Sequence, residues 1–239
     1  MENTLYISNK YNKLNPNYHI EDSEFKAKNL LTILNKNFFD FKKINNVIDV
    51  GCGAGEVLKF IKKSKLFNSK TKFIGFDVNK KIIHFANKNC DNNIKFYCKN
   101  FFKTKSVLKS SLIICTDVYE HIEDYINFLK KLLKYGNFFL FNIPLDISVR
   151  SLLSKKIIED NFKKVGHIHF FNKHVAQLIL NYCGYKIIDK FYAKNFLDHQ
   201  TKNVKQKIYS IPIRLFDYIN EDLTATFFGG YSLVVFAKK

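Results

Sequence analysis

Short apolar stretches recur along the chain at the length of β-strands, and amphipathic stretches separate them. Continuous apolar runs of five or so residues are typical of buried parallel strands, whereas apolar spacings of three and four residues indicate helices. The predicted strands cover 46–50, 72–77, 94–98, 111–116, 137–143, 185–192 and 231–237. The predicted helices between them cover 55–64, 79–89, 122–135 and 172–183, with a short helix near 152–158.

This alternation predicts an α/β fold, a doubly wound and mostly parallel sheet of seven strands in a single domain over 1–239. Asp22 and Ser23 offer an N-cap for a further helix with apolar residues at helical spacing, so 1–40 is predicted to form a helical cap over the site. Residues 41–144 form the predicted core and 145–239 the second half. Within this second half, residues 193–226 are an insertion that is predicted either to bind a ligand or to be partly disordered.

The first strand runs into a glycine-rich turn, Gly51-Cys52-Gly53-Ala54-Gly55, and a helix follows at once. Glycines allow close backbone approaches, and the N–H groups that begin a helix form a polar cradle for a ligand. Glu56 stands where a dinucleotide fingerprint requires glycine. Asp49 and Glu56 flank the turn with carboxylates, which disfavour a pyrophosphate and suit a ligand with a cationic end.

A second acidic residue strengthens the nucleotide-type interpretation. Asp77 ends the second strand, a little over 20 residues beyond the glycine turn, where such folds place the carboxylate that binds ribose hydroxyls. A solvated turn residue is the alternative. Ligands of open α/β sheets bind beyond the carboxyl ends of the strands, so 51–55, Asp77, Asn100, 116–117 and 142–144 are expected around one cleft.

The pattern D-x-G-x-G-x-G at 49–55, followed by Asp77, resembles the class I S-adenosylmethionine (SAM) dependent methyltransferases, with a likeness to the small-molecule and glycan O-methyltransferases of the type 11/23 group. The resemblance spans about 40–239. It implies a Rossmann-like fold with an antiparallel last strand after Gly229-Gly230, and SAM as cofactor. The cofactor-binding residues that it implies, together with their neighbours, are Asp49, Gly51, Cys52, Gly53, Gly55, Asp77, Val78, Asn100, Phe101, Thr116 and Asp117. Asn100 would bind the adenine amino group beside Phe101, or serve as a plain turn residue.

Methyl transfer from a sulfonium requires an acceptor atom that lies in line with the S–CH₃ bond and is deprotonated. Positioning supplies much of the rate, and a general base adds roughly 10²–10⁴-fold. The candidate bases are His121, His167 and His169, and His167 is preferred to His169 on the acceptor side. A hydrogen-bonded structural histidine is the alternative for either member of the second pair.

Asp117-x-x-Glu120-His121 places two carboxylates and an imidazole on one face of a helical turn, a donor set that suits Mg²⁺ or Mn²⁺. The pattern resembles the E-x-x-E-H of ubiquinone-biosynthesis O-methyltransferases and of small-RNA 3′-end 2′-O-methyltransferases, two groups thought to use a metal there. Here the first residue is Asp117, one methylene shorter than Glu. The alternative is that Glu120 and His121 open a helix and shape the pocket without a metal.

Composition adds a formal net charge of +18 with scattered lysines, which indicates a compositional bias rather than a nucleic-acid stripe. Five cysteines without close pairs are expected to be reduced thiols of a cytoplasmic protein. The absence of a leader or of an apolar run near 18 residues predicts no membrane span.

Six aromatic residues of the insertion are candidates for an acceptor wall, namely Phe196, Tyr209, Phe216, Tyr218, Phe227 and Phe228. Arg150 and Arg214 are candidate clamps for an anionic acceptor, or solvated surface residues.

Three functions follow from these patterns. The first is methyl transfer from SAM to a small-molecule or glycan-precursor acceptor at oxygen, with S-adenosylhomocysteine (SAH) as product. The second is RNA methylation, motivated by the charge and by D-x-x-E-H, and disfavoured because no RNA module is visible. The third is a methyltransferase-like subunit without turnover, because fold does not set function. The acceptor and the oligomeric state stay open.

Overall fold

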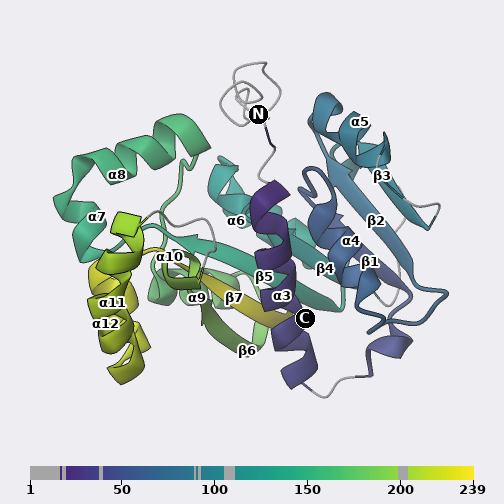
Figure 1. The fold of residues 1–239 in the computed structure, drawn as a ribbon. Helices are drawn as coiled ribbons and strands as arrows, with labels where there is room; N and C mark the ends of the chain where they lie inside the picture. Colours follow the sequence, from purple (N-terminus) through teal and green to yellow (C-terminus); the bar gives the residue numbers. More distant parts are fainter. Residues whose placement is uncertain are drawn as a thin grey trace.

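The computed structural model describes residues 17, 20–37, 40–88, 90, 93–104, 111–198 and 204–239. These residues form a seven-stranded sheet in the order β3-β2-β1-β4-β5-β7-β6, in which β7 is antiparallel to both of its neighbours (Figure 1). The strands are β1 (Asn46–Val50), β2 (Lys72–Asp77), β3 (Ile94–Cys98), β4 (Ser111–Thr116), β5 (Phe138–Leu145), β6 (Lys186–Ala193) and β7 (Tyr231–Lys238). The predicted doubly wound, mostly parallel fold is therefore confirmed, including its antiparallel last strand.

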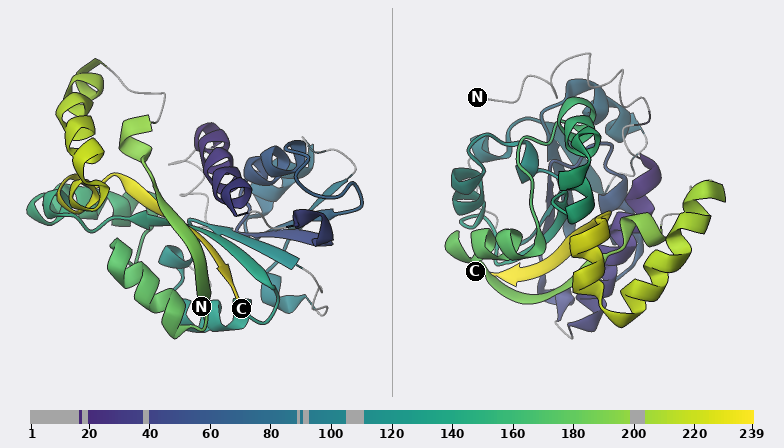
Figure 2. Two further views of the ribbon diagram at one scale, coloured as in Figure 1. Left: turned by 90° about the horizontal axis from the view of Figure 1, so that it is seen from below. Right: turned by 90° about the vertical axis from the view of Figure 1, so that its left-hand side faces the viewer.

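Helices cover both faces of this sheet (Figure 2). One apolar core lies under α3, α4 and α5, and a second lies under α6 and α9. The α-helices are α3 (Ile20–Lys36), α4 (Glu56–Lys63), α5 (Lys80–Lys88), α6 (Tyr125–Leu132), α7 (Val149–Leu153), α8 (Lys155–Asp160), α9 (Lys173–Tyr182), α10 (Asn195–Asp198), α11 (Val204–Ile219) and α12 (Glu221–Phe228). Short 3₁₀ turns are η1 (Phe41–Lys43), η2 (Phe101–Lys103) and η3 (Tyr119–His121), and η4 (Asn161–Val165) is a π-helix.

The fifth strand is longer than predicted, because Pro144 does not end it. β5 continues to Leu145, and Pro144 pairs with Ser232 of β7. The carbonyl of Asn142 accepts a hydrogen bond from Asp117 N at 3.0 Å, so the backbone groups of Asn142 point toward β4. Residues two apart in a strand have the same orientation, so the backbone groups of Pro144 also point to that side. β4 pairs with β5 only as far as Asn142, so the N–H that proline lacks has no strand partner there.

The N-terminal helix is present and begins at Ile20, two residues before the predicted cap. Its buried residues Ala27, Leu30, Ile33 and Leu34 follow helical spacing and pack with α4 and β7. The insertion is helical over its described residues, since α10, α11 and α12 occupy most of it. Its prediction as a binding insertion or a partly disordered segment stays untested.

Across the described ranges, no helix is long and apolar enough to cross a bilayer. The division of the chain into a cap, a core and an acceptor-side half remains a prediction.

Candidate functional site

A cavity of about 500 Å³ lies at the carboxyl ends of β1, β2 and β4. Seven of the eleven predicted cofactor residues line it, namely Gly51, Gly53, Asp77, Val78, Asn100, Phe101 and Asp117. Phe76, Phe102 and Phe128 add aromatic walls. A wider groove of about 670 Å³ beside the edge strand β6 contains none of the predicted site residues. The cavity therefore gathers residues from separate strands at the switch point between β1 and β4, where open α/β sheets bind ligands.

The glycine turn connects β1 to α4 and forms one wall of the cavity. Gly53 has φ +51° and Gly55, the N-cap of α4, has φ +79°, a region that L side chains rarely adopt. The backbone N–H groups of Gly51 and Cys52 donate to the carbonyl of Phe76 at 2.8 and 3.1 Å. These bonds attach the turn to the end of β2, so Gly51 and Gly53 of the turn and the end of β2 border one cavity.

Asp77 links the end of β2 to the glycine turn. Its Oδ2 accepts a hydrogen bond from Gly53 N at 3.0 Å, and its Oδ1 accepts one from Asn79 N at 2.8 Å. Burial raises the pKa of Asp77 above its ordinary value, although these backbone hydrogen bonds oppose the rise. The carboxylate is thus held in one orientation at the cavity wall.

Four predicted cofactor residues lie behind the wall and do not line the cavity: Asp49, Cys52, Gly55 and Thr116. Asp49 is 1% exposed near the end of β1, and its Oδ1 has no hydrogen-bond partner among the described residues. Burial, and then the charge of Asp77, raise the pKa of Asp49 to about 7. The Cys52 thiol lies against Gly75 of β2 and is buried in the core. A role for these four residues in cofactor binding stays a prediction.

Asn100 and Phe101 lie together at the end of β3. The Asn100 Oδ1 accepts a hydrogen bond from Phe102 N at 2.9 Å and caps the turn η2. Phe101 is buried against Phe76 and Tyr135, with ring centroids 5.2 and 4.9 Å apart. Asn100 therefore has the turn role that the sequence also allowed, and it still lines the cavity.

Asp117 follows β4 with φ +53° and connects the cavity to the N-terminal helix. Its Oδ1 accepts a hydrogen bond from Asn142 Nδ2 at 2.7 Å, and its Oδ2 lies 2.7 Å from Lys26 Nζ of α3. Burial alone would raise the pKa of Asp117, but the Lys26 ammonium and these hydrogen bonds hold it below its ordinary value. Sequence reasoning missed Lys26, which is one of 39 basic residues and has no motif around it.

Glu120, His121 and His167 form the polar centre of the site. One potential ligand atom from each lies within 4.8 Å of the others, and the two imidazole centroids are 4.9 Å apart. His121 Nδ1 donates to the carbonyl of Gly166 at 2.9 Å, and His167 Nδ1 donates to Asp146 Oδ2 at 2.7 Å. In the neutral rings, these bonds leave the lone pair on Nε2 of both histidines.

Glu120 has the most unusual environment of the three. It is 0% exposed, and neither of its carboxyl oxygens has a hydrogen-bond partner in the described part of the chain. Its Oε1 lies 3.8 Å from His121 Nε2. Burial, and then the charge of Asp117, raise the pKa of Glu120 well above its ordinary value. A buried carboxyl beside two imidazole lone pairs is stabilised by a proton or by a cation.

The residues that could hold a metal together include two of the three predicted candidates, Glu120 and His121, and the predicted set with Asp117 stays a prediction. Asp117 is engaged by Lys26 and Asn142, and His167 joins Glu120 and His121. Both imidazoles donate Nδ1–H to an oxygen, the arrangement that orients metal-binding histidines. Two imidazoles and one carboxylate suit first-row transition ions such as Mn²⁺, Fe²⁺ or Zn²⁺ better than Mg²⁺. The residues fit such an ion, and Asp146 is a partner of His167 that the sequence did not indicate.

The remaining candidates lie elsewhere. His169 Nε2 contacts the carbonyl of Ile122 at 3.0 Å and its ring packs on Tyr125, as expected of a structural histidine. The described aromatic residues of the insertion do not line the cavity. The Tyr209 side chain lies outside the described part of the chain. Arg214 donates to the carbonyl of Leu197, and Arg150 is exposed on α7.

Comparison with known proteins agrees with this geometry. The family model Methyltransf_23, described as a methyltransferase domain, matches residues 19–190. Des-methyl DIF-1 methyltransferase A of Dictyostelium discoideum is 30% identical over 168 residues, which are 70% of this chain. The match spans 40% of the length of that relative.

Solved structures share the fold. The plantazolicin methyltransferase BpumL in complex with SAH superposes with a TM-score of 0.65 at 20% identity, over 99% of this chain and 93% of that one. Magnesium protoporphyrin IX methyltransferase from Synechocystis PCC 6803 with bound SAH gives 0.60 at 13% identity, over 99% and 97%. Because the family model matches residues 19–190, and because the glycine turn and Asp77 border one cavity, the chain belongs to the methyltransferase domain family.

Proposed function

We propose that this enzyme transfers the methyl group of SAM to an oxygen atom of a small-molecule or glycan-precursor acceptor. The observation that carries the proposal is His121 at the cavity wall, backed by the buried Glu120 and His167. A hydroxyl acceptor must lose its proton before or during transfer, and a neutral imidazole at the cavity supplies a base for that step.

His121 is the proposed base. Its Nδ1 donates to a backbone carbonyl, so the neutral ring carries its lone pair on Nε2. In the proposed step the S–CH₃ bond breaks, an O–CH₃ bond forms, SAH leaves as a neutral thioether, and the acceptor proton moves to the imidazole. The Glu120 carboxyl lies 3.8 Å from that nitrogen and the ring of His167 packs beside the His121 ring, so both border the proposed base.

The cavity is of small-molecule size, and SAM itself would occupy part of it. A volume of about 500 Å³ with aromatic walls falls within the roughly 300–1,000 Å³ of small-molecule sites. The relative from Dictyostelium discoideum is named for a small molecule, des-methyl DIF-1, which agrees with this substrate class. The RNA alternative requires a focused basic surface at the cavity, and its described lining includes only Lys99 and Lys131 as basic residues other than histidine.

Glu120, His121 and His167 would hold a divalent transition ion if the enzyme uses one. A bound ion would act as a Lewis acid that lowers the pKa of the acceptor hydroxyl. Asp146 and the Gly166 carbonyl would orient the two imidazoles toward it. Metal content per chain after expression in Mn²⁺ or Zn²⁺, measured for the wild type and for His167→Asn, tests this assignment without an acceptor.

The function is tested by transfer of label from methyl-labelled SAM into a fractionated extract of the source organism, with and without EDTA. Label in a nuclease-resistant small-molecule or glycan fraction supports the proposal, and label lost on RNase treatment contradicts it. His121→Asn should lower transfer about 10²–10⁴-fold while SAM affinity stays within about threefold.

His169→Asn is the matched control, because that histidine lies on the same segment as His167 and makes a structural hydrogen bond. It should keep most of the transfer activity. Equal losses in His121→Asn and His169→Asn would contradict the assignment of His121 as the base.

A further inference from the structure

The helices at the carboxyl end of β5 expose an apolar surface. α7 packs beside α12, and α12 packs beside α11, so the three helices adjoin on the side that faces the viewer in the right-hand view of Figure 2. We define the apolar lobe surface by six side chains that are 51–84% exposed: Leu152, Leu153, Ile211, Leu215, Ile219 and Phe227. Exposed apolar side chains gathered on adjoining helices are typical of an interaction surface.

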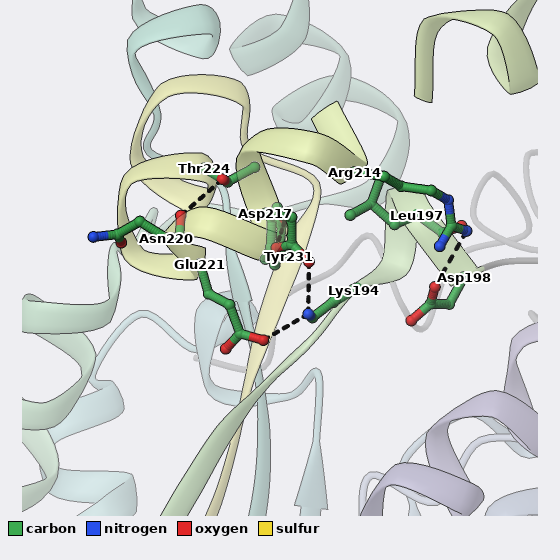
Figure 3. A network of polar contacts seen from close by, with 9 residues as sticks. All are labelled: Lys194, Leu197, Asp198, Arg214, Asp217, Asn220, Glu221, Thr224 and Tyr231. Atoms are coloured by element: carbon green, nitrogen blue, oxygen red, sulfur yellow. Dashed lines mark hydrogen bonds and ion pairs between the residues drawn. The ribbon is translucent and has the colours of Figure 1, made fainter. Parts of the chain in front are cut away.

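The orientation of α11 is set from inside the molecule by a polar network (Figure 3). Asp217 is 8% exposed, its Oδ2 lies 2.6 Å from Lys194 Nζ, and its Oδ1 accepts a hydrogen bond from Tyr231 at 2.7 Å. Lys194 also pairs with Glu221 of α12 at 2.6 Å. A buried carboxylate with these partners holds its helix in place. Because the side of α11 that carries Asp217 faces the protein, its opposite, apolar side faces solvent.

The same surface is bordered by positive charge. Residues 149–165 carry five basic side chains, Arg150, Lys155, Lys156, Lys163 and Lys164, and two acidic ones, Glu159 and Asp160. Both acids pair within the segment, at 2.7 Å to Lys163 and 3.0 Å to Lys164. Lys194, which directly follows β6, pairs with the buried Asp217 and with Glu221 of α12. Lys173 of α9 pairs with Asp222, the other acid of α12. The exposed side of the lobe is therefore apolar with a net positive rim.

We propose that the apolar lobe surface docks on a lipid bilayer that contains anionic phospholipids. Apolar side chains that enter the headgroup region beside cationic ones are the composition of interfacial helices, and anionic lipids attract a basic rim. A second copy is disfavoured as the occupant because two chains of net charge +18 repel each other.

Docking would place the active-site end of the molecule at the bilayer. β5 pairs Leu145 with Tyr231 and continues into α7, so the lobe lies at the carboxyl ends of the strands, as the cavity does. An acceptor that partitions into the membrane surface would then reach the cavity from the bilayer. Binding to the bilayer can be measured without an acceptor, so it does not depend on which acceptor the enzyme uses.

The test is co-sedimentation of the full chain with vesicles of phosphatidylcholine, with and without phosphatidylglycerol. We expect binding to the vesicles that contain phosphatidylglycerol, weakened by added salt. The double variant Leu152→Ser/Leu153→Ser should bind at least about tenfold more weakly, because each buried methylene contributes to membrane affinity. Lys155→Glu/Lys156→Glu should also bind more weakly, and by an amount that shrinks with salt.

The matched control is Leu178→Ser/Tyr182→Ser on α9, outside the lobe, where the side chains are 54% and 68% exposed. This variant should bind the vesicles as the wild type does. Thermal unfolding of each variant checks that the fold is kept. Absence of binding to phosphatidylglycerol vesicles, equal losses in Leu152→Ser/Leu153→Ser and in the control Leu178→Ser/Tyr182→Ser, or a wild-type dimer in solution that Leu152→Ser/Leu153→Ser dissociates would each overturn the proposal.

Discussion

Gly53 and Gly55 lie two residues apart in one turn, yet a methyl group at each position meets different surroundings. A Cβ on Gly53 has no heavy atom within 4 Å, whereas a Cβ on Gly55 would lie 2.3 Å from the ring of Phe96. Both residues have positive φ, which costs an L residue about 1–2 kcal/mol. Overpacking against Phe96 adds about 1–3 kcal/mol at Gly55.

We therefore expect Gly55→Ala to be the less stable variant. At about 2–4 °C per kcal/mol for a chain of this size, Gly53→Ala should lower the melting temperature by about 2–8 °C, and Gly55→Ala by a further 2–12 °C or so. Circular dichroism of the cofactor-free proteins measures the difference.

For SAM affinity the order is reversed, and Gly53→Ala should be the more affected variant. Gly53 lines the cavity, and its added methyl group would occupy open space there, so Gly53→Ala should bind SAM at least about tenfold more weakly, a loss of roughly 1.4 kcal/mol. Gly55 lies behind the wall, so folded Gly55→Ala should bind SAM nearly as the wild type does. Isothermal titration calorimetry below both melting temperatures gives these affinities. Equal melting temperatures, or unchanged SAM binding by Gly53→Ala, would refute the reasoning.

Two further predictions concern charged groups at the site. Lys26→Met removes the partner of Asp117, and because both side chains are about a quarter exposed (24% and 23%), it should cost about 1–3 kcal/mol rather than the 3–5 of a fully buried pair. The control is Lys28→Met, because Lys28 pairs with Glu24 on the exposed side of the same helix. It should change the free energy of unfolding by less than about 0.5 kcal/mol. Similar losses of unfolding free energy for the two variants in urea would argue against the Lys26 tether. In the folded protein the pKa of Asp49 is raised from 3.8 to about 7, so the folded protein binds more protons than the unfolded chain between these two pH values. The wild type should therefore lose stability relative to Asp49→Asn as the pH rises from about 4 to about 7. The loss amounts to about 1.4 kcal/mol for each pH unit in this range. Denaturant unfolding across this range without cofactor measures the loss, and a constant difference between the two proteins would contradict it.

Local pattern was sufficient for most of the fold. β2, β3 and β4 have the predicted bounds because each is an apolar run between turn residues, a signal that lies within a few neighbouring positions. Pro144 misled the prediction for β5 because tolerance of proline depends on which side of the strand has a partner. That information belongs to the sheet and not to the segment.

The candidate site divides in the same way. Gly51, Gly53 and Asp77 could be named from sequence because a strand, a turn and a helix in succession place them at one sheet edge. The aromatic residues of the insertion were expected at the acceptor wall, but the buried pairing of Asp217 with Lys194 and Tyr231 orients α11 so that its apolar side faces solvent.

By itself, the sequence determined the order of strands and helices, the glycine turn, the carboxylate at the end of β2 and hence the methyltransferase family. Tertiary structure alone decided that His167, held by Asp146, joins Glu120 and His121, and that Lys26 engages Asp117. The physical reason is range. Strand and helix patterns are written in neighbouring residues, whereas these contacts join segments that meet only when the sheet forms and its carboxyl ends gather.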